Sequence, residues 1–139
     1  MGVRRFEDLV VWQLAFELQR RVFAFSASGS PWRDVRYRDQ IRDASASATR
    51  NIAEGFGRFR PSEFARFLEI AHGSLNETKS HILDGRARGY LAEADCDSLL
   101  RLTHRAMGAN ARLMKYLRSC PRQDSRRPPI SGKRSSRRT

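Results

Sequence analysis

The sequence predicts an all-α protein, folded as an antiparallel four-helix bundle with up-down-up-down connections. Apolar residues recur at helical spacing in four segments of about 20 to 28 residues, and no segment alternates apolar and polar residues as a half-buried strand would. Short connections rich in Gly, Pro and Ser separate the segments. Helices joined by short connections pack as antiparallel neighbours, so the pattern favours a bundle.

The first predicted helix covers residues 6–27 and carries two apolar stripes about 140° apart at 100° per residue. A helix that packs on one core needs only one stripe, so the second stripe favours an interface between subunits. A wide core face in a monomer is the alternative. One stripe comprises Leu9, Trp12, Phe16 and Phe23, and the other comprises Val11, Leu14, Leu18, Val22 and Phe25.

The second predicted helix covers residues 31–59. Pro31 suits its first turn and Ser30 its N-cap. The small residues 44–48 in its middle would let a neighbouring helix approach closely, although they are also ordinary helix formers. Its expected apolar line is Ile41, Ala44 or Ser45, Ala48, Ile52 and Phe56.

Two further helices are predicted over residues 61–87 and 92–119. Pro61 opens the first, with Glu63 in the first turn, where the helix dipole favours a negative charge. Gly85 and Gly89 mark its end, and Pro121 stops the last helix. The expected buried positions are Phe64, Phe67, Leu68, Ala71, Leu75 and Ile82 in the first, and Leu99, Leu102, Ala106, Leu113 and Leu117 in the second.

The chain is strongly basic, with 24 Arg and 3 Lys against 15 acidic residues and a formal charge of +12. Residues 121–139 hold seven basic residues and one acid, which is half of that charge, and too few apolar residues to form a core. We therefore assign residues 1–120 to the bundle and residues 121–139 to a disordered tail. The tail is either a nucleic-acid-binding arm or a solvated extension.

Other features exclude several classes of protein. No run of 18 apolar residues exists, so no membrane association is expected, and the N-terminus does not match a signal peptide. The two cysteines, Cys96 and Cys120, are far apart and form no metal-binding motif. We therefore expect a cytoplasmic protein without a disulfide framework.

No catalytic or metal site is predicted, and no cofactor. Glu69 and His72 form one Glu-x-x-His motif of the kind found in di-iron bundles, but the second motif is missing. Gly55 and Gly57 resemble a phosphate loop only superficially, because they follow a helix and lack the third glycine of GxGxxG. No Ser-His-Asp arrangement is evident.

A polar group in the second helix is unusual for a bundle. Asn51, Glu54 and Arg58 recur at i, i+3 and i+7 on one face, and Glu54 and Arg58 form a favourable i, i+4 pair. Such residues form either a structural hydrogen-bond network or a binding site. The residues alone favour the network and leave the binding site open.

Several segments together resemble the small bacterial four helix bundle proteins, also called ribosomal RNA intervening-sequence proteins. The accessory variability protein of diversity-generating retroelements is similar to them. The resemblance extends over residues 6–117. It rests on FEDLVVWQ (6–13), QIR (40–42), NIAEGFGR (51–58), Phe64 with FLEIA (67–71), GSL (73–75) with Glu77, and GYL (89–91).

The resemblance implies a bundle that assembles as a ring-like homopentamer without known enzymatic activity. For the retroelement relative it implies a basic surface that binds nucleic acid and a reverse transcriptase. The chain departs from the family in having Asp43 where a basic residue is usual, a more polar run at 45–49, and no serine cap near Pro61. The first departure changes the local charge, and the basic tail lies outside the family pattern.

We therefore expect a non-enzymatic homo-oligomer that binds RNA or DNA through arginines, mainly by contacts to phosphate. The alternative is a structural or adaptor protein that docks an acidic protein partner. The polar group Asn51, Glu54 and Arg58 is a second candidate site. Besides the tail, the candidate nucleic-acid contacts are Arg36, Arg38, Arg42, Arg50, Arg58, Arg60 and Arg66.

Overall fold

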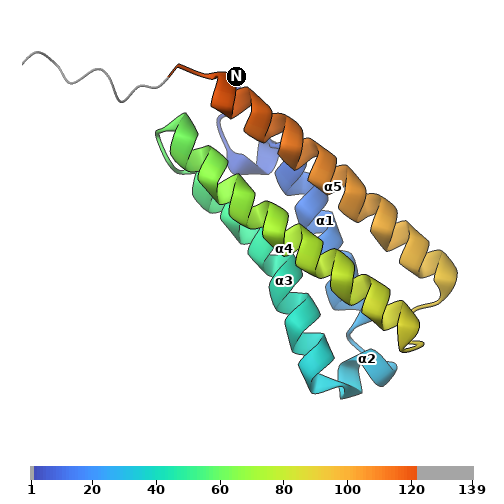
Figure 1. Ribbon diagram of the computed structural model, residues 1–139. Helices are drawn as coiled ribbons and strands as arrows, with labels where there is room; N and C mark the ends of the chain where they lie inside the picture. The colour runs from blue at the N-terminus through green and yellow to red at the C-terminus, as the bar shows by residue number, and fades with distance from the viewer. Residues whose placement is uncertain (1, 122–139) are drawn as a thin grey trace, which may run out of the picture.

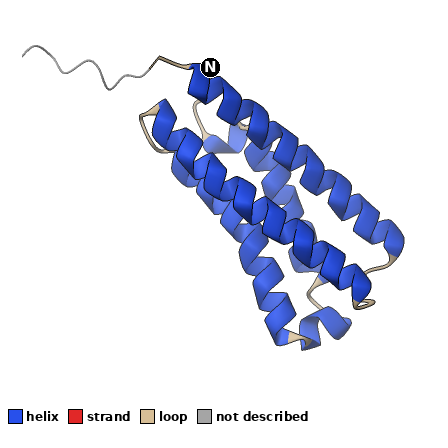
Figure 2. Ribbon diagram, in the orientation of Figure 1, coloured by secondary structure: helices blue, strands red, loops and turns tan. Residues whose placement is uncertain are grey.

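The computed structural model describes residues 2–121, and the predicted tail beyond Pro121 lies outside them. Within this range the protein is a packed helical bundle without strands (Figures 1 and 2), so the predicted all-α class is confirmed. Its four long helices are α1 (Val10–Phe25), α3 (Val35–Phe56), α4 (Pro61–Ala87) and α5 (Glu93–Ser119). Each packs against the next, and α5 returns to α1 and closes the bundle (Figure 1).

The N-terminus differs from the single helix predicted over residues 6–27. A 3-10 turn, η1 (Phe6–Asp8), comes first, and Leu9 then adopts an extended conformation before α1 begins. The Phe6 ring packs edge-on against Trp12 at 5.2 Å, and Gln13 Nε2 donates to the Glu7 carbonyl at 2.9 Å. These contacts fold the first turn back onto α1, which a periodicity of apolar residues does not reveal.

The helix predicted over residues 31–59 is divided in two. A short helix, α2 (Gly29–Arg33), is followed by Asp34, whose carboxylate accepts from Tyr37 N at 3.2 Å and caps α3. Ser28, rather than Ser30, is the N-cap residue of α2. Asp34 adopts φ −79° and ψ 84°, which interrupts the helix. The N-cap preference of Asp explains why the chain restarts a helix here.

Helices α4 and α5 lie within one residue of the predicted ranges. Pro61 is in the first turn of α4, as expected. Helices α3 and α4 approach closely where α3 ends, because a Cβ at Gly55 would lie 2.8 Å from Phe67 Cβ. The loop 57–60 joins the two helices at the end of the bundle where α5 also finishes (Figure 1).

The core consists of two apolar clusters, one toward each end of the bundle. Buried hydroxyl groups donate to carbonyls of their own helices, for example Thr78 to Ser74 at 2.8 Å and Thr103 to Leu99 at 2.7 Å. Asn110 is fully buried and donates from α5 to the Leu68 carbonyl of α4 at 2.8 Å. Because their donors are satisfied, the two threonines can be buried at little cost, whereas Asn110 Oδ1 is buried without a hydrogen-bond partner within residues 2–121.

The two apolar stripes of the first helix have different environments. Val11, Leu18 and Val22 of one stripe are buried in the core. In the other stripe, Phe16 and Phe23 are exposed on the outer side of α1. Trp12 stacks on Phe16 with a centroid separation of 4.8 Å. The outer stripe is therefore a row of aromatic rings that the chain covers only in part, whereas Leu9 at its start is buried.

Candidate nucleic-acid interface

Two of the seven candidate arginines are held by aromatic rings beside α2. Arg38 lies 4.1 Å from the centre of the Trp32 ring and donates to the Trp32 carbonyl at 3.0 Å. Arg42 lies 4.6 Å from the Phe23 ring and donates to Ser26 Oγ at 2.8 Å. Both guanidinium groups are occupied by contacts that attach α3 to α1 and α2. We therefore assign them a structural role.

Arg36 and Arg50 are exposed but lie on different parts of α3. Arg36 is in the first turn, and Arg50 is four turns further along, at 4.0 Å from Asp43. Fourteen residues of α-helix separate them by about 21 Å. The candidate arginines of α3 therefore do not form one compact patch.

The remaining candidates gather where α3 meets α4. Arg58 donates to Glu54 Oε1 at 2.7 Å and lies 4.9 Å from the Phe67 ring. Arg66 lies 5.7 Å from the same ring and forms no ion pair within residues 2–121. Arg60 is exposed and precedes Pro61. These three arginines bring positive charge to the α3–α4 loop.

The polar group Asn51, Glu54 and Arg58 is divided by the structure. Asn51 donates to the Ser47 carbonyl at 2.8 Å and to Ser47 Oγ at 3.1 Å, and Ser47 Oγ lies 2.9 Å from Ser74 Oγ on α4. Asn51 therefore belongs to a structural network between the two helices. Glu54 and Arg58 form a separate, exposed pair.

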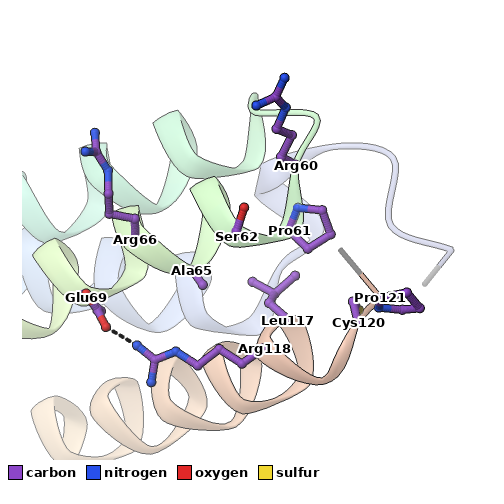
Figure 3. A pocket seen from close by; sticks show the side chains of 10 residues that line it. All are labelled: Arg60, Pro61, Ser62, Ala65, Arg66, Glu69, Leu117, Arg118, Cys120 and Pro121. Atoms are coloured by element: carbon purple, nitrogen blue, oxygen red, sulfur yellow. Dashed lines mark hydrogen bonds and ion pairs between the residues drawn. The ribbon is translucent and has the colours of Figure 1, made fainter. Parts of the chain in front are cut away.

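A pocket of about 240 Å³ lies between the start of α4 and the end of α5 (Figure 3). Arg118 reaches from α5 and forms an ion pair with Glu69 of α4 along one side. Arg60 and Arg66 extend from the opposite side of the pocket. The chain leaves the described region at Pro121, on the rim of this pocket. Arg60, Arg66 and Arg118 therefore contribute to the same pocket as Pro121, where the described chain ends.

A further concentration of positive charge lies on α5 after Asp97, and none of its residues was among the candidates predicted from the sequence. Residues 98–121 contain five basic residues and no acid, and residues 98–139 carry +11 of the chain's +12. Arg101, Arg105, Arg112 and Lys115 are all exposed, and none forms an ion pair within residues 2–121. At 100° per residue they lie within about 80° of one another on the helix. We call these four residues the α5 stripe.

The charge pattern that identifies the α5 stripe is present in the sequence. It is concealed when the net charge is counted separately for residues 1–120 and 121–139. Splitting the chain at residue 120 assigns +6 to each part, whereas splitting it at residue 97 leaves only +1 in the first part. Fifteen basic and fourteen acidic residues balance in residues 1–97. The whole of α5 carries only +2, because Glu93, Asp95 and Asp97 lie in its first turns, and its five basic residues all follow Asp97.

The opposite end of the bundle is nearly neutral. Asp34 accepts from Tyr90 Oη at 2.7 Å and from Arg88 at 3.1 Å, and Arg88 also pairs with Asp84 at 3.0 Å. The Tyr90 hydroxyl, the Tyr37 amide and Arg88 together hold the pKa of Asp34 below its ordinary value. Burial raises the pKa of the neighbouring Tyr37 phenol. We call Asp34, Tyr37, Asp84, Arg88 and Tyr90 the closed end.

The Glu-x-x-His motif lies on the outer side of α4. Glu69 is engaged by Arg118, and His72 Nε2 lies 3.3 Å from Asn76 Nδ2. Within residues 2–121, no three His, Cys, Asp or Glu side chains are grouped as metal ligands would be. None of the helices described is long and apolar enough to cross a membrane.

Comparison with known proteins agrees with the fold. The structure is similar to that of a Bacteroides thetaiotaomicron protein of unknown function from the S23 ribosomal protein family. The TM-score is 0.66 with 18% sequence identity, over 76% of this chain and 99% of that one. No curated protein matches the chain significantly. The family model described as 23S rRNA-intervening sequence protein matches residues 7–109. Because this match covers most of the bundle, the chain belongs to the 23S rRNA-intervening sequence protein family.

Proposed function

We propose that the protein is a non-enzymatic, self-associating helical protein that binds RNA or DNA through the α5 stripe and the basic residues of 122–139. The observation that carries the proposal is the charge of +5 on residues 98–121, which form most of α5. Its four stripe residues are exposed on one side of the helix, with no acid in residues 98–121. Paired arginines elsewhere in the bundle contribute less, because nearby carboxylates offset their charge.

The dimensions of the α5 stripe suit a polyanion. Arg101 and Lys115 are fourteen residues apart, so the stripe is about 21 Å long. That length corresponds to about six nucleotides along one strand of a B-form duplex. Guanidinium groups bind phosphate by two parallel hydrogen bonds, and the residues of 122–139 add seven further basic side chains. Binding by such a surface is expected to depend on salt rather than on base sequence.

Self-association is proposed from the outer side of α1. Phe16 and Phe23 are exposed there beside the half-buried Trp12. A row of large apolar side chains on one helix is typical of an interface. The family resemblance favours a homopentamer. Assembly would multiply the charge of each α5 stripe by the number of subunits.

Charge reversal on α5 tests the binding surface. Arg101, Arg105 and Arg112 are each replaced by Glu in the full chain, and affinity for a fluorescently labelled RNA is measured by anisotropy. We expect a loss of about a hundredfold or more, with a salt dependence shallower by about one unit per lost phosphate contact. Circular dichroism and size-exclusion chromatography check that the variant keeps its fold and assembly.

The matched control reverses three exposed arginines away from α5, namely Arg36, Arg50 and Arg86. The total charge changes equally, so a general loss of attraction would affect both variants alike. We expect the control to bind at least tenfold more tightly than the α5 variant. Equal losses would contradict a specific role of the α5 stripe. Capture of a protein partner that resists nuclease would favour an acidic protein as the ligand instead.

Replacement of Phe16 and Phe23 by Ser tests self-association. Both rings are partly exposed, but Phe23 also contacts Arg42 and Phe16 stacks on Trp12, so circular dichroism must show that the variant keeps its fold. Light scattering should report a smaller assembly than that of the wild type. A wild-type protein that is monomeric at micromolar concentration would contradict this part of the proposal.

A further inference from the structure

Exposed aromatic rings occur in two places in the described chain. Phe16, Phe23 and Trp32 lie on the side of α1 and α2 already assigned to assembly and to arginine stacking. Phe59 and Tyr116 lie at the other location, where the α3–α4 loop and α5 finish. Phe59 is 97% exposed and Tyr116 is 46% exposed. Within residues 2–121, neither ring contacts another aromatic ring or a guanidinium group.

The geometry points to a function for these two rings, and the inference rests on the proposed nucleic-acid binding. We infer that Phe59 and Tyr116 stack on unpaired bases, so that this end of the bundle selects single-stranded RNA or DNA over a duplex. A duplex hides the faces of its bases within the helix. A single strand exposes them to any aromatic ring placed beside its phosphates.

Both rings are placed beside positive charge. Arg58 and Arg60 flank Phe59 in the loop, and Arg66 lies one turn into α4. Tyr116 follows Lys115 directly and lies one turn after Arg112, so it extends the α5 stripe. This interleaving of arginines with exposed rings is what binding of single strands requires.

The pocket beside α4 lies at the same end of the bundle as the two rings. Its lining includes Arg60, the residue after Phe59, and Leu117, the residue after Tyr116. Figure 3 shows Leu117 of α5 next to Pro61 of α4, whereas the Arg60 side chain points away from α5. Neither ring lines this pocket, since Tyr116 points about 100° away from Leu117 around α5. A strand that follows the α5 stripe toward residue 121 reaches Tyr116, and the loop that carries Phe59 lies at the same end of the bundle.

Charge alone would give the opposite preference. A duplex carries about twice the charge of a single strand per unit length, so a surface that binds phosphates only should favour the duplex. A preference for single strands therefore reports contacts to bases. This reasoning separates the inference from the proposed function, which requires only binding to phosphate.

The test compares a 20-nucleotide poly-uridine RNA with a 20-base-pair duplex at equal salt. Full-length wild type should bind the single strand more tightly. Replacing both Phe59 and Tyr116 with Ala should weaken single-strand binding by about fivefold to 150-fold for each stacked ring. Duplex affinity and the salt dependence should not change, because no charge is removed. Phe59→Trp with Tyr116→Phe keeps the rings and should retain the preference.

Val35→Ala is the control, because Val35 is an exposed apolar residue at the opposite end of the bundle. It should leave both affinities unchanged. A wild type that prefers the duplex, or a double Ala variant that binds poly-uridine like the wild type, overturns the inference. Loss of assembly by that variant in light scattering also overturns it, because the rings would then contact a second copy. Binding to neither nucleic acid contradicts the proposed function itself.

Discussion

Arginine side chains have different environments at the two ends of the bundle. At the closed end, Arg88 is shared between Asp34 and Asp84, and Tyr90 completes the group. At the other end, which we call the tail end, Arg60 and Arg66 adjoin the point where the chain continues into residues 122–139. At this end Arg58 pairs with Glu54 and Arg118 with Glu69, and the rings of Phe59 and Tyr116 are exposed. At the closed end one arginine joins two carboxylates in a single group, whereas Arg58 and Arg118 of the tail end each pair with one carboxylate.

The comparison shows that net charge is a poor guide to binding until each charge is assigned a partner. Residues 1–97 contain fifteen basic side chains, more than half of the total, yet carry a net charge of +1. Residues 98–139 contain twelve basic side chains and one acid. A polyanion is attracted by the excess of basic over acidic residues, and nearly all of this excess lies in residues 98–139, on α5 and beyond it.

Removal of residues 122–139 should have the largest of the expected effects, and it acts at the tail end. The segment holds seven basic residues and one acid, so affinity for RNA should fall by about a hundredfold or more near 100 mM salt. The α5 stripe should retain measurable binding. Anisotropy titrations of the full and shortened chains measure both effects. An unchanged affinity would make the segment irrelevant, and complete loss would make α5 inactive.

Gly85→Ala should break the closed end while leaving the tail end intact. A Cβ at this position would overlap the Tyr37 hydroxyl, which donates to the His81 carbonyl at 2.7 Å. We expect unfolding free energy to fall by about 1–3 kcal/mol, measured by urea denaturation at fixed protein concentration. RNA affinity of the folded variant should be unchanged.

Gly73→Ala is the matched control on the same helix. Nothing lies within 4 Å of a Cβ at Gly73, and the residue is exposed in the interior of α4. Ala has the higher helix propensity, so this variant should gain up to about 1 kcal/mol. A loss of stability equal to that of Gly85→Ala would show that the Tyr37 contact is not the cause.

Asp34→Asn should produce the smallest of these effects, seen as a change in pH dependence. The folded pKa of Asp34 lies below its ordinary value of 3.8 because of Tyr90, the Tyr37 amide and Arg88. The ionised carboxylate therefore stabilises the fold fully above that value, and this contribution is lost as pH falls through the folded pKa. Asn cannot titrate, so the wild type and the variant should converge in stability at acidic pH.

The matching substitution Asp97→Asn changes an exposed carboxylate on α5. Thermal unfolding between pH 2 and pH 7 should show convergence for Asp34→Asn but not for Asp97→Asn. Equal pH profiles for the two variants would contradict the special position of Asp34 at the closed end.

The helices were predictable because each carries a strong apolar periodicity and ends at Gly or Pro. Pro61 and Pro121 therefore fixed two boundaries closely. The interruption at Asp34 was not predicted, since Ser30 and Pro31 formed a plausible start and nothing local required a second one. The 3-10 turn before α1 depends on the packing of Phe6 against Trp12, which brings together residues six apart.

The sequence predicted the type of residue at the candidate site, namely arginine. It predicted only in part which arginines are available for binding. Arg38 and Arg42 seemed available because the rings that hold them, Trp32 and Phe23, lie on other elements. Asn51 matched the spacing of Glu54 but turns toward Ser47 instead. Such partners arise from tertiary packing. The α5 stripe needed no tertiary information, because periodicity and charge counting are sufficient to find it.

The salt dependence of RNA binding by the full-length protein tests the central claim most directly. Affinity for a long labelled RNA is measured by anisotropy between 50 and 200 mM salt. Six or more phosphate contacts would lower the affinity by about a thousandfold or more over this range. Binding that is steep in salt and indifferent to base order would support the positive charge of residues 98–139 as the interface. Undetectable binding at 50 mM salt, or binding insensitive to salt, would contradict it.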